Sequence, residues 1–116
     1  MDDFDIPIFK KIYSLYKLFY GYRHAVSKQD RYTIWQRCEG LILDILENIL
    51  LASQQTKQEK LPTLQKTSLK LNLLRVFLRM CKDVKSIDNK KYTQLEEIVD
   101  EIGRMLGGWI KSTKER

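Results

Sequence analysis

The sequence predicts an all-α protein, an antiparallel up-down-up-down four-helix bundle. Hydrophobic residues recur in steps of three and four along four successive segments, which is the period of an amphipathic helix. The chain has 116 residues but only 5 Gly and 2 Pro, so few residues interrupt long elements. No alternating run of β-branched residues competes with this pattern. We expect helices at about residues 6–24, 31–53, 62–84 and 88–111, in a single domain that spans residues 1–116.

Each predicted helix has one apolar stripe that is expected to face the core. The four stripes comprise Ile8, Ile12, Leu15, Phe19 and Tyr22 in the first helix, Trp35, Cys38, Ile42, Ile45, Ile49 and Ala52 in the second, Leu64, Thr67, Leu71, Leu74, Leu78 and Cys81 in the third, and Tyr92, Leu95, Val99, Ile102, Leu106 and Trp109 in the fourth. Four stripes of this length fill the centre of one bundle.

Local signals indicate where the helices begin. Asp5 can cap the first helix, and Pro7 suits its first turn, where the missing N–H is not needed. The second helix is expected to open near Asp30. The polar run 53–60 has no periodicity and is expected to be a loop, so the third helix would open at Pro62. The fourth helix would begin near residues 86–88.

The chain carries more apolar surface than one bundle buries. The third helix has a second stripe on nearly the opposite side, which includes Leu73, Phe77 and Met80, and the first helix adds a row of tyrosines. Exposed stripes of this size usually mark protein–protein interfaces, and self-association is the commonest kind. We therefore expect a homo-oligomer, although a broad core face with partly exposed tyrosines is an alternative. The candidate interface residues are Tyr13, Tyr16, Tyr20, Leu73, Phe77, Met80, Gly103 and Gly107.

The fourth helix contains Gly103, Gly107 and Gly108 within six positions. Each glycine in a helix interior costs roughly 1 kcal/mol relative to alanine, so a compensating reason is expected. The simplest is close approach of a neighbouring helix. Alternatively the helix ends at Gly107, but Trp109 continues the apolar repeat beyond it.

The net charge of +6 points to a polyanion or an acidic protein as a partner. The excess lies in residues 57–85, where Arg75, Arg79 and Lys82 share one face of the third helix. Arginine forks suit phosphate and carboxylate groups, whereas a merely solvated face is the alternative. Replacing both arginines by alanine is expected to weaken RNA or DNA binding and to leave the helical circular dichroism unchanged.

The residues for catalysis and metal binding are largely missing from the sequence. It contains one histidine, His24, and its two cysteines, Cys38 and Cys81, fall on core positions as inert thiols. The acidic group at residues 96–101 lacks the Glu-x-x-His pattern of dimetal bundles, and Asp100 and Glu101 are expected to lie within pairing reach of Arg104, four and three residues away. We expect no enzyme activity, no cofactor and no bound metal.

The amino-terminal sequence is acidic, which is unlike a targeting segment, and the longest apolar run is too short to span a bilayer. We therefore expect a cytoplasmic protein that makes no membrane contact.

Four segments carry a resemblance to a known family. They are residues 31–37 (RYTIWQR), 41–47 (LILDILE), 71–80 (LNLLRVFLRM) and 100–112 (DEIGRMLGGWIKS). Together they resemble the accessory variability determinant of diversity-generating retroelements, a four-helix bundle protein. The bulky Trp35 departs from that pattern, where a small residue is expected. The related proteins encoded in ribosomal RNA intervening sequences have a glycine-ended second-helix stretch, which residues 43–49 lack, so the accessory branch fits better.

The resemblance implies a homopentamer without catalytic activity that binds the retroelement's reverse transcriptase and nucleic acid during mutagenic copying of a template RNA. Carried over by position, and joined with Lys82 from the helix face, the candidate binding residues are Arg37, Arg75, Arg79, Lys82, Arg104 and Lys111. The alternative is a ring-forming interaction module of the intervening-sequence type, whose basic face docks an acidic protein. A ligand-binding bundle that uses the first-helix tyrosines is less favoured, because such stripes usually serve packing.

Overall fold

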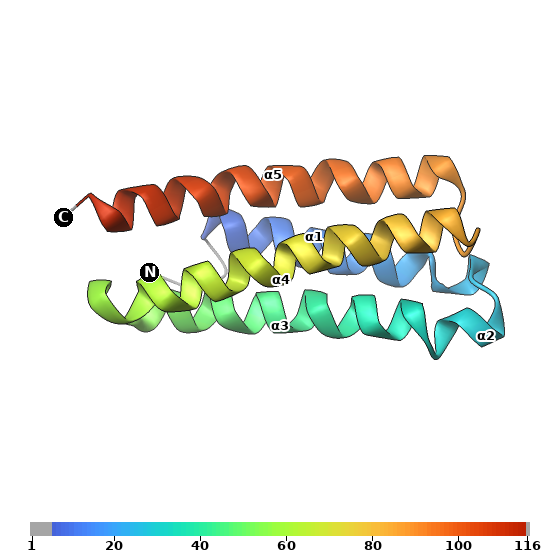
Figure 1. Cartoon of the computed structure of the whole chain (residues 1–116), viewed down its shortest axis with the longest axis horizontal. Helices are drawn as coiled ribbons and strands as arrows, with labels where there is room; N and C mark the ends of the chain where they lie inside the picture. Colours follow the sequence, from blue (N-terminus) through green and yellow to red (C-terminus); the bar gives the residue numbers. More distant parts are fainter. Residues whose placement is uncertain (1–5, 116) are drawn as a thin grey trace.

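The computed structural model describes residues 6–115 and is all-helical over that range. Four long helices run side by side (Figure 1): α1 (Pro7–Gly21), α3 (Ile34–Gln54), α4 (Lys57–Asp83) and α5 (Asn89–Lys114). Helix α3 packs on α1 and α4, and α5 packs on the same two helices, so each long helix has two neighbours. This arrangement agrees with the predicted bundle. The described part of the chain contains no β-strand.

The connection between α1 and α3 is a corner built from two short elements, the 3-10 turn η2 (Arg23–Ala25) and helix α2 (Lys28–Arg31). The side chain of Arg31 holds this corner together. Its Nε donates to the carbonyls of Val26 and Arg23 at 2.9 and 3.2 Å, and its Nη2 donates to the carbonyl of His24 at 3.3 Å. The Ser86 hydroxyl donates to Asp30 at 2.7 Å and ties the corner to the turn between α4 and α5.

Several helix ends differ from the sequence prediction: α1 ends at Gly21 and not at residue 24, α3 begins at Ile34 and not near Asp30, and α5 extends to Lys114 and not to residue 111. The polar run 53–60 is not a loop, because α3 extends to Gln54 and α4 already begins at Lys57. A capping box starts α4: the Glu59 amide donates to the Thr56 hydroxyl at 3.3 Å, and the Thr56 amide donates to the Glu59 carboxylate at 3.0 Å. Pro62 therefore lies inside the helix instead of opening it. Asp5 lies outside the described residues.

The predicted start of α5 is confirmed, and so is its passage through the glycines. The Asp88 carboxylate caps the helix by accepting from the Lys91 amide at 2.8 Å. The helix then continues without a break past Gly107 and Gly108 to Lys114. Beyond the glycines, Trp109 packs against the core as the repeat predicted.

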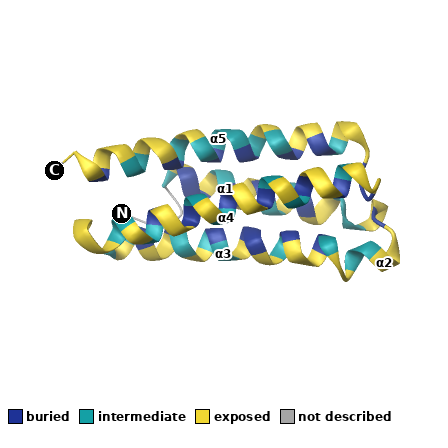
Figure 2. Ribbon diagram, in the orientation of Figure 1, coloured by how far each residue is buried: buried dark blue, intermediate teal, exposed yellow. Residues whose placement is uncertain are grey.

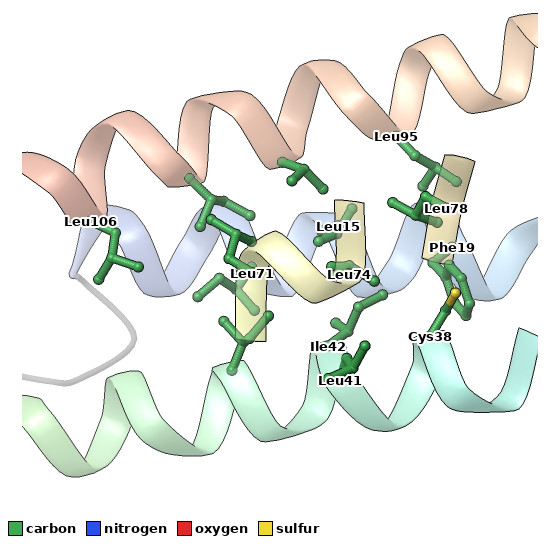
Figure 3. Packing of buried hydrophobic residues seen from close by; sticks show 14 of the residues in the cluster. Leu15, Phe19, Cys38, Leu41, Ile42, Leu71, Leu74, Leu78, Leu95 and Leu106 are labelled. Carbon is green, nitrogen blue, oxygen red and sulfur yellow. The ribbon is translucent and has the colours of Figure 1, made fainter. Parts of the chain in front are cut away.

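The core contains the four predicted stripes, which face one another along the bundle axis (Figures 2 and 3), together with Val26, Leu41 and Ile87. Trp35 is buried and its ring stacks on Phe19, with centroids 3.8 Å apart and planes 8° apart. The bulky tryptophan is thus part of the core. Cys38 and Cys81 are buried in adjacent helices with sulfur atoms 3.9 Å apart, as free thiols. Burying each large apolar side chain contributes about 1.5–3 kcal/mol to folding.

Candidate nucleic-acid and assembly surfaces

Arg75 faces the neighbouring helix α5 instead of open solvent. Its Nη1 lies 3.3 Å from the Asp100 carboxylate, and its Nη2 donates to the Val99 carbonyl at 3.5 Å. The guanidinium fills the space beside Gly103, where a β-carbon would collide with it. The missing side chain of Gly103 is therefore explained by a contact within one chain, since any β-carbon would displace Arg75.

The other two basic residues of the predicted α4 face also have partners in the chain. Arg79 is exposed and lies 3.3 Å from the carboxylate of Asp83, one turn along the same helix. The Lys82 ammonium lies 5.1 Å from the centre of the Tyr92 ring. Burial, together with a hydrogen bond to Glu96, raises the pKa of Tyr92 above its ordinary value. These contacts leave Arg75, Arg79 and Lys82 less available to an external anion than their spacing alone indicates.

The remaining basic candidates are more accessible. Arg37 is exposed at the start of α3, with its guanidinium 5.4 Å from the centre of the Phe77 ring. Arg104 and Lys111 are exposed on α5, and neither forms an ion pair with any residue from 6 to 115. Between them, positions 107 and 108 have no neighbouring atom within 4 Å of a β-carbon position. This stretch of α5 is open to close approach from outside the bundle.

An apolar row runs along the outer side of α4 and is here called the α4 stripe. It comprises Leu69, Leu73, Val76, Met80 and Val84, all exposed. The predicted interface residue Phe77 lies beside this row but packs partly against the core. Because these five residues occupy the side opposite the core positions, no other helix of the bundle covers them. The second apolar stripe predicted from the sequence did not include Val76. Its position, three residues after Leu73 and four before Met80, is the helical spacing that could have identified it.

A second exposed apolar surface, here called the α1–α3 face, includes Tyr13, Tyr20, Leu43 and Leu50. Tyr16 bridges its two helices by donating to Glu39 at 2.9 Å, and this hydrogen bond raises the pKa of Tyr16. The two leucines were not among the predicted interface residues. A helical wheel of α3 separates both from the core stripe, which is the signal that could have identified them.

Two acidic residues of α5 form ion pairs with other helices. Asp100 pairs with Arg75, and Glu101 lies 3.2 Å from the Lys11 ammonium, so the predicted pairing of Asp100 with Arg104 is wrong. Over residues 6–115 no group of three His, Cys, Asp or Glu side chains is arranged to hold a metal ion. None of the helices in that range is long and apolar enough to cross a membrane.

Comparison with known proteins places the chain in a family. A family model described as bAvd-like matches residues 7–113, from the start of α1 to the last turn of α5. None of the curated proteins matches the sequence. The matched range contains both the exposed apolar surfaces and the open stretch of α5.

Proposed function

The chain belongs to the bAvd-like family of diversity-generating retroelement accessory proteins, and from this premise we propose that it supports mutagenic reverse transcription by binding the reverse transcriptase and the nucleic-acid backbone. The observation that carries the proposal is the family match over residues 7–113. The family is accessory and non-catalytic. We propose the same for this chain, acting in the cytoplasm where the polymerase copies its template.

The charge of the chain supports the nucleic-acid part of the proposal. The net charge is +6, and Arg37, Arg104 and Lys111 are exposed without ion pairs among residues 6–115. Contact with phosphates gives affinity without reading sequence, and it weakens steeply as salt rises. The exposed cations of α3 and α5 therefore suit contacts with a nucleic-acid backbone that tolerate any template sequence.

The assembly part of the proposal rests on the two exposed apolar surfaces. The α4 stripe and the α1–α3 face lie on different helices and have different composition. When one surface of a subunit meets a different surface of the next, the contact is heterologous and closes into a ring if the rotation permits. We propose such a ring for this chain, with five subunits as the family resemblance implies.

Light scattering tests the assembly. A particle mass near five times 13.8 kDa is expected for the wild-type chain. Val76→Asp places a charge in the centre of the α4 stripe and is expected to give monomers with an unchanged helical spectrum. Thr93→Asp, on the exposed side of α5, is the matched control and should assemble normally. A monomeric wild-type chain would overturn the ring.

Co-purification tests the partners. The tagged chain should retain the reverse transcriptase of its own retroelement, and the pair should protect template RNA from nuclease. If the polymerase is retained but RNA or DNA is bound by neither the chain nor the complex, the protein is an interaction module alone. If neither polymerase nor nucleic acid is retained at moderate salt, the proposed function is wrong.

A further inference from the structure

Cations without ion pairs gather at the end of the bundle formed by residues 23–33 and 84–90, here called the α2 end. Figure 1 shows that α2 and the turn between α4 and α5 lie at the same end. Arg23, Lys28, Lys85 and Lys90 all belong to it, and none of them forms an ion pair within residues 6–115. Lys28, Lys85 and Lys90 are exposed. Arg37 adds a fifth such cation at the start of α3.

The carboxylates near the α2 end already have partners within the chain. Asp30 accepts from Ser86, Asp83 pairs with Arg79, and Asp88 both caps α5 and pairs with Lys91 at 3.3 Å. Residues 23–33 and 84–90 carry five basic side chains but only two carboxylates, those of Asp30 and Asp88. The end therefore presents a net positive surface to an external polyanion.

The exposed aromatic ring of Tyr32 lies among these basic side chains. The Tyr32 side chain is 60% exposed, and the Arg23 guanidinium lies 5.5 Å from the centre of its ring. Tyr32 also lines a surface hollow of about 520 Å³, together with Ile34, Arg37, Phe77 and Met80, the last of which belongs to the α4 stripe. The lining thus combines one cation and the polar Thr33 and Gln36 with apolar side chains, and the hollow is large enough for a nucleobase.

We propose that the α2 end is a binding site for single-stranded nucleic acid, in which a base stacks on Tyr32 at the hollow and the flanking phosphates contact Arg23 and Arg37. Stacking on an exposed aromatic ring is available only to an unpaired base, because the bases of a duplex are stacked on one another. Basic side chains beside an aromatic ring are the usual combination for such strands. This inference rests on the proposed function, of which it specifies the strand type and the site.

Fluorescence anisotropy with a labelled oligo-deoxythymidine and with a duplex of equal length tests the site. Tyr32→Ala is expected to weaken single-strand binding about tenfold and duplex binding little, whereas Tyr32→Phe should bind both as the wild type does. Arg37→Ala should weaken both and lower the salt dependence by about one counterion. Lys10→Ala is the control, since Lys10 is exposed on α1, away from this end, and forms no ion pair with any residue from 6 to 115.

The outcomes separate this inference from the function on which it rests. If Tyr32→Ala binds the single strand as tightly as the wild type, the site is wrong although nucleic-acid binding stands. If the wild-type chain binds neither probe at low salt, the nucleic-acid part of the proposed function fails together with the site. If Tyr32→Ala instead lowers the particle mass in light scattering, the hollow receives a second copy of the chain, and the single-strand site is overturned.

Discussion

The guanidinium of Arg75 occupies the space that a side chain at Gly103 would need. This contact between α4 and α5 is accompanied by the ion pair to Asp100 and the hydrogen bond to the Val99 carbonyl. Gly103 disfavours its own helix, but the absence of a side chain there makes room for the contact of Arg75 with α5. Gly107, one turn further on, has no such neighbour.

The two glycines are expected to respond differently to alanine. Gly107→Ala adds a methyl group in open space and should raise the free energy of unfolding by about 0.5–1 kcal/mol. Gly103→Ala should gain less, because its methyl group displaces Arg75 from Asp100 and Val99. Urea denaturation at a fixed protein concentration measures both. In an Arg75→Ala background, Gly103→Ala should recover the full gain, and equal gains in the wild-type background would contradict the contact.

Basic residues with and without a carboxylate partner are expected to contribute differently to nucleic-acid binding. Arg104→Ala with Lys111→Ala removes two exposed cations and should lower the salt dependence of binding by about two counterions. Arg75→Ala with Arg79→Ala should have a smaller effect on binding, since both side chains already have carboxylate partners. The structure thus revises the expectation drawn from spacing alone. Anisotropy titrations over a salt series compare the two double variants, and a larger loss in the second would refute this ranking.

Stability should depend on pH through the cap of α5. The hydrogen bond from the Lys91 amide, aided by the Lys91 ammonium, lowers the pKa of Asp88 below its ordinary value. A carboxyl group with a lowered pKa stabilises the fold above the unfolded-state pKa, about 4, and loses this contribution as the pH falls through the folded-state value.

The stability advantage of the wild type over Asp88→Ala should therefore shrink in acid. Thermal melts of both proteins from neutral pH to below about pH 3 would measure this difference. Roughly this range is needed because it includes the ordinary carboxyl pKa. Asp88→Asn is the matched control, because it keeps a capping oxygen that does not titrate in this range. A difference between wild type and Asp88→Ala that stays constant down to the lowest pH would exclude the charged cap.

The two cysteine thiols are expected to be unreactive in the folded chain. Both are buried, and the hydrogen bond shared with Cys81 together with burial raises the pKa of Cys38. Because the thiolate is the reactive form, an aromatic disulfide reagent should label neither cysteine until the bundle opens. Ser112→Cys supplies an exposed thiol as the control. Rapid labelling of Cys38 or Cys81 in the native protein would contradict their burial.

Most of the core was predicted from the sequence, whereas the start of α4 and the corner between α1 and α3 were not. The start of α4 was placed at Pro62 because proline favours the first turn, but the capping box at Thr56 and Glu59 begins the helix five residues earlier. That signal was present in the spacing of these two residues and was hidden by the polar composition around them. The corner with η2 and α2 was missed because its main constraint, the contacts of Arg31 with three carbonyls, depends on how the chain turns back.

The sequence by itself determined the four long helices and the residues that form their core, because the helical period is a local property of each segment. Only the tertiary structure decided which partners the polar residues take. Asp100 could reach Arg104 on its own helix, but the packing of α4 against α5 brings Arg75 to it. The same packing places Arg75 where a side chain at Gly103 would lie, and it leaves the position of a β-carbon at Gly107 without a neighbour. A side chain on a helix surface can reach either its own next turn or a neighbouring helix, and only the rotation and register of the packed helices select between the two.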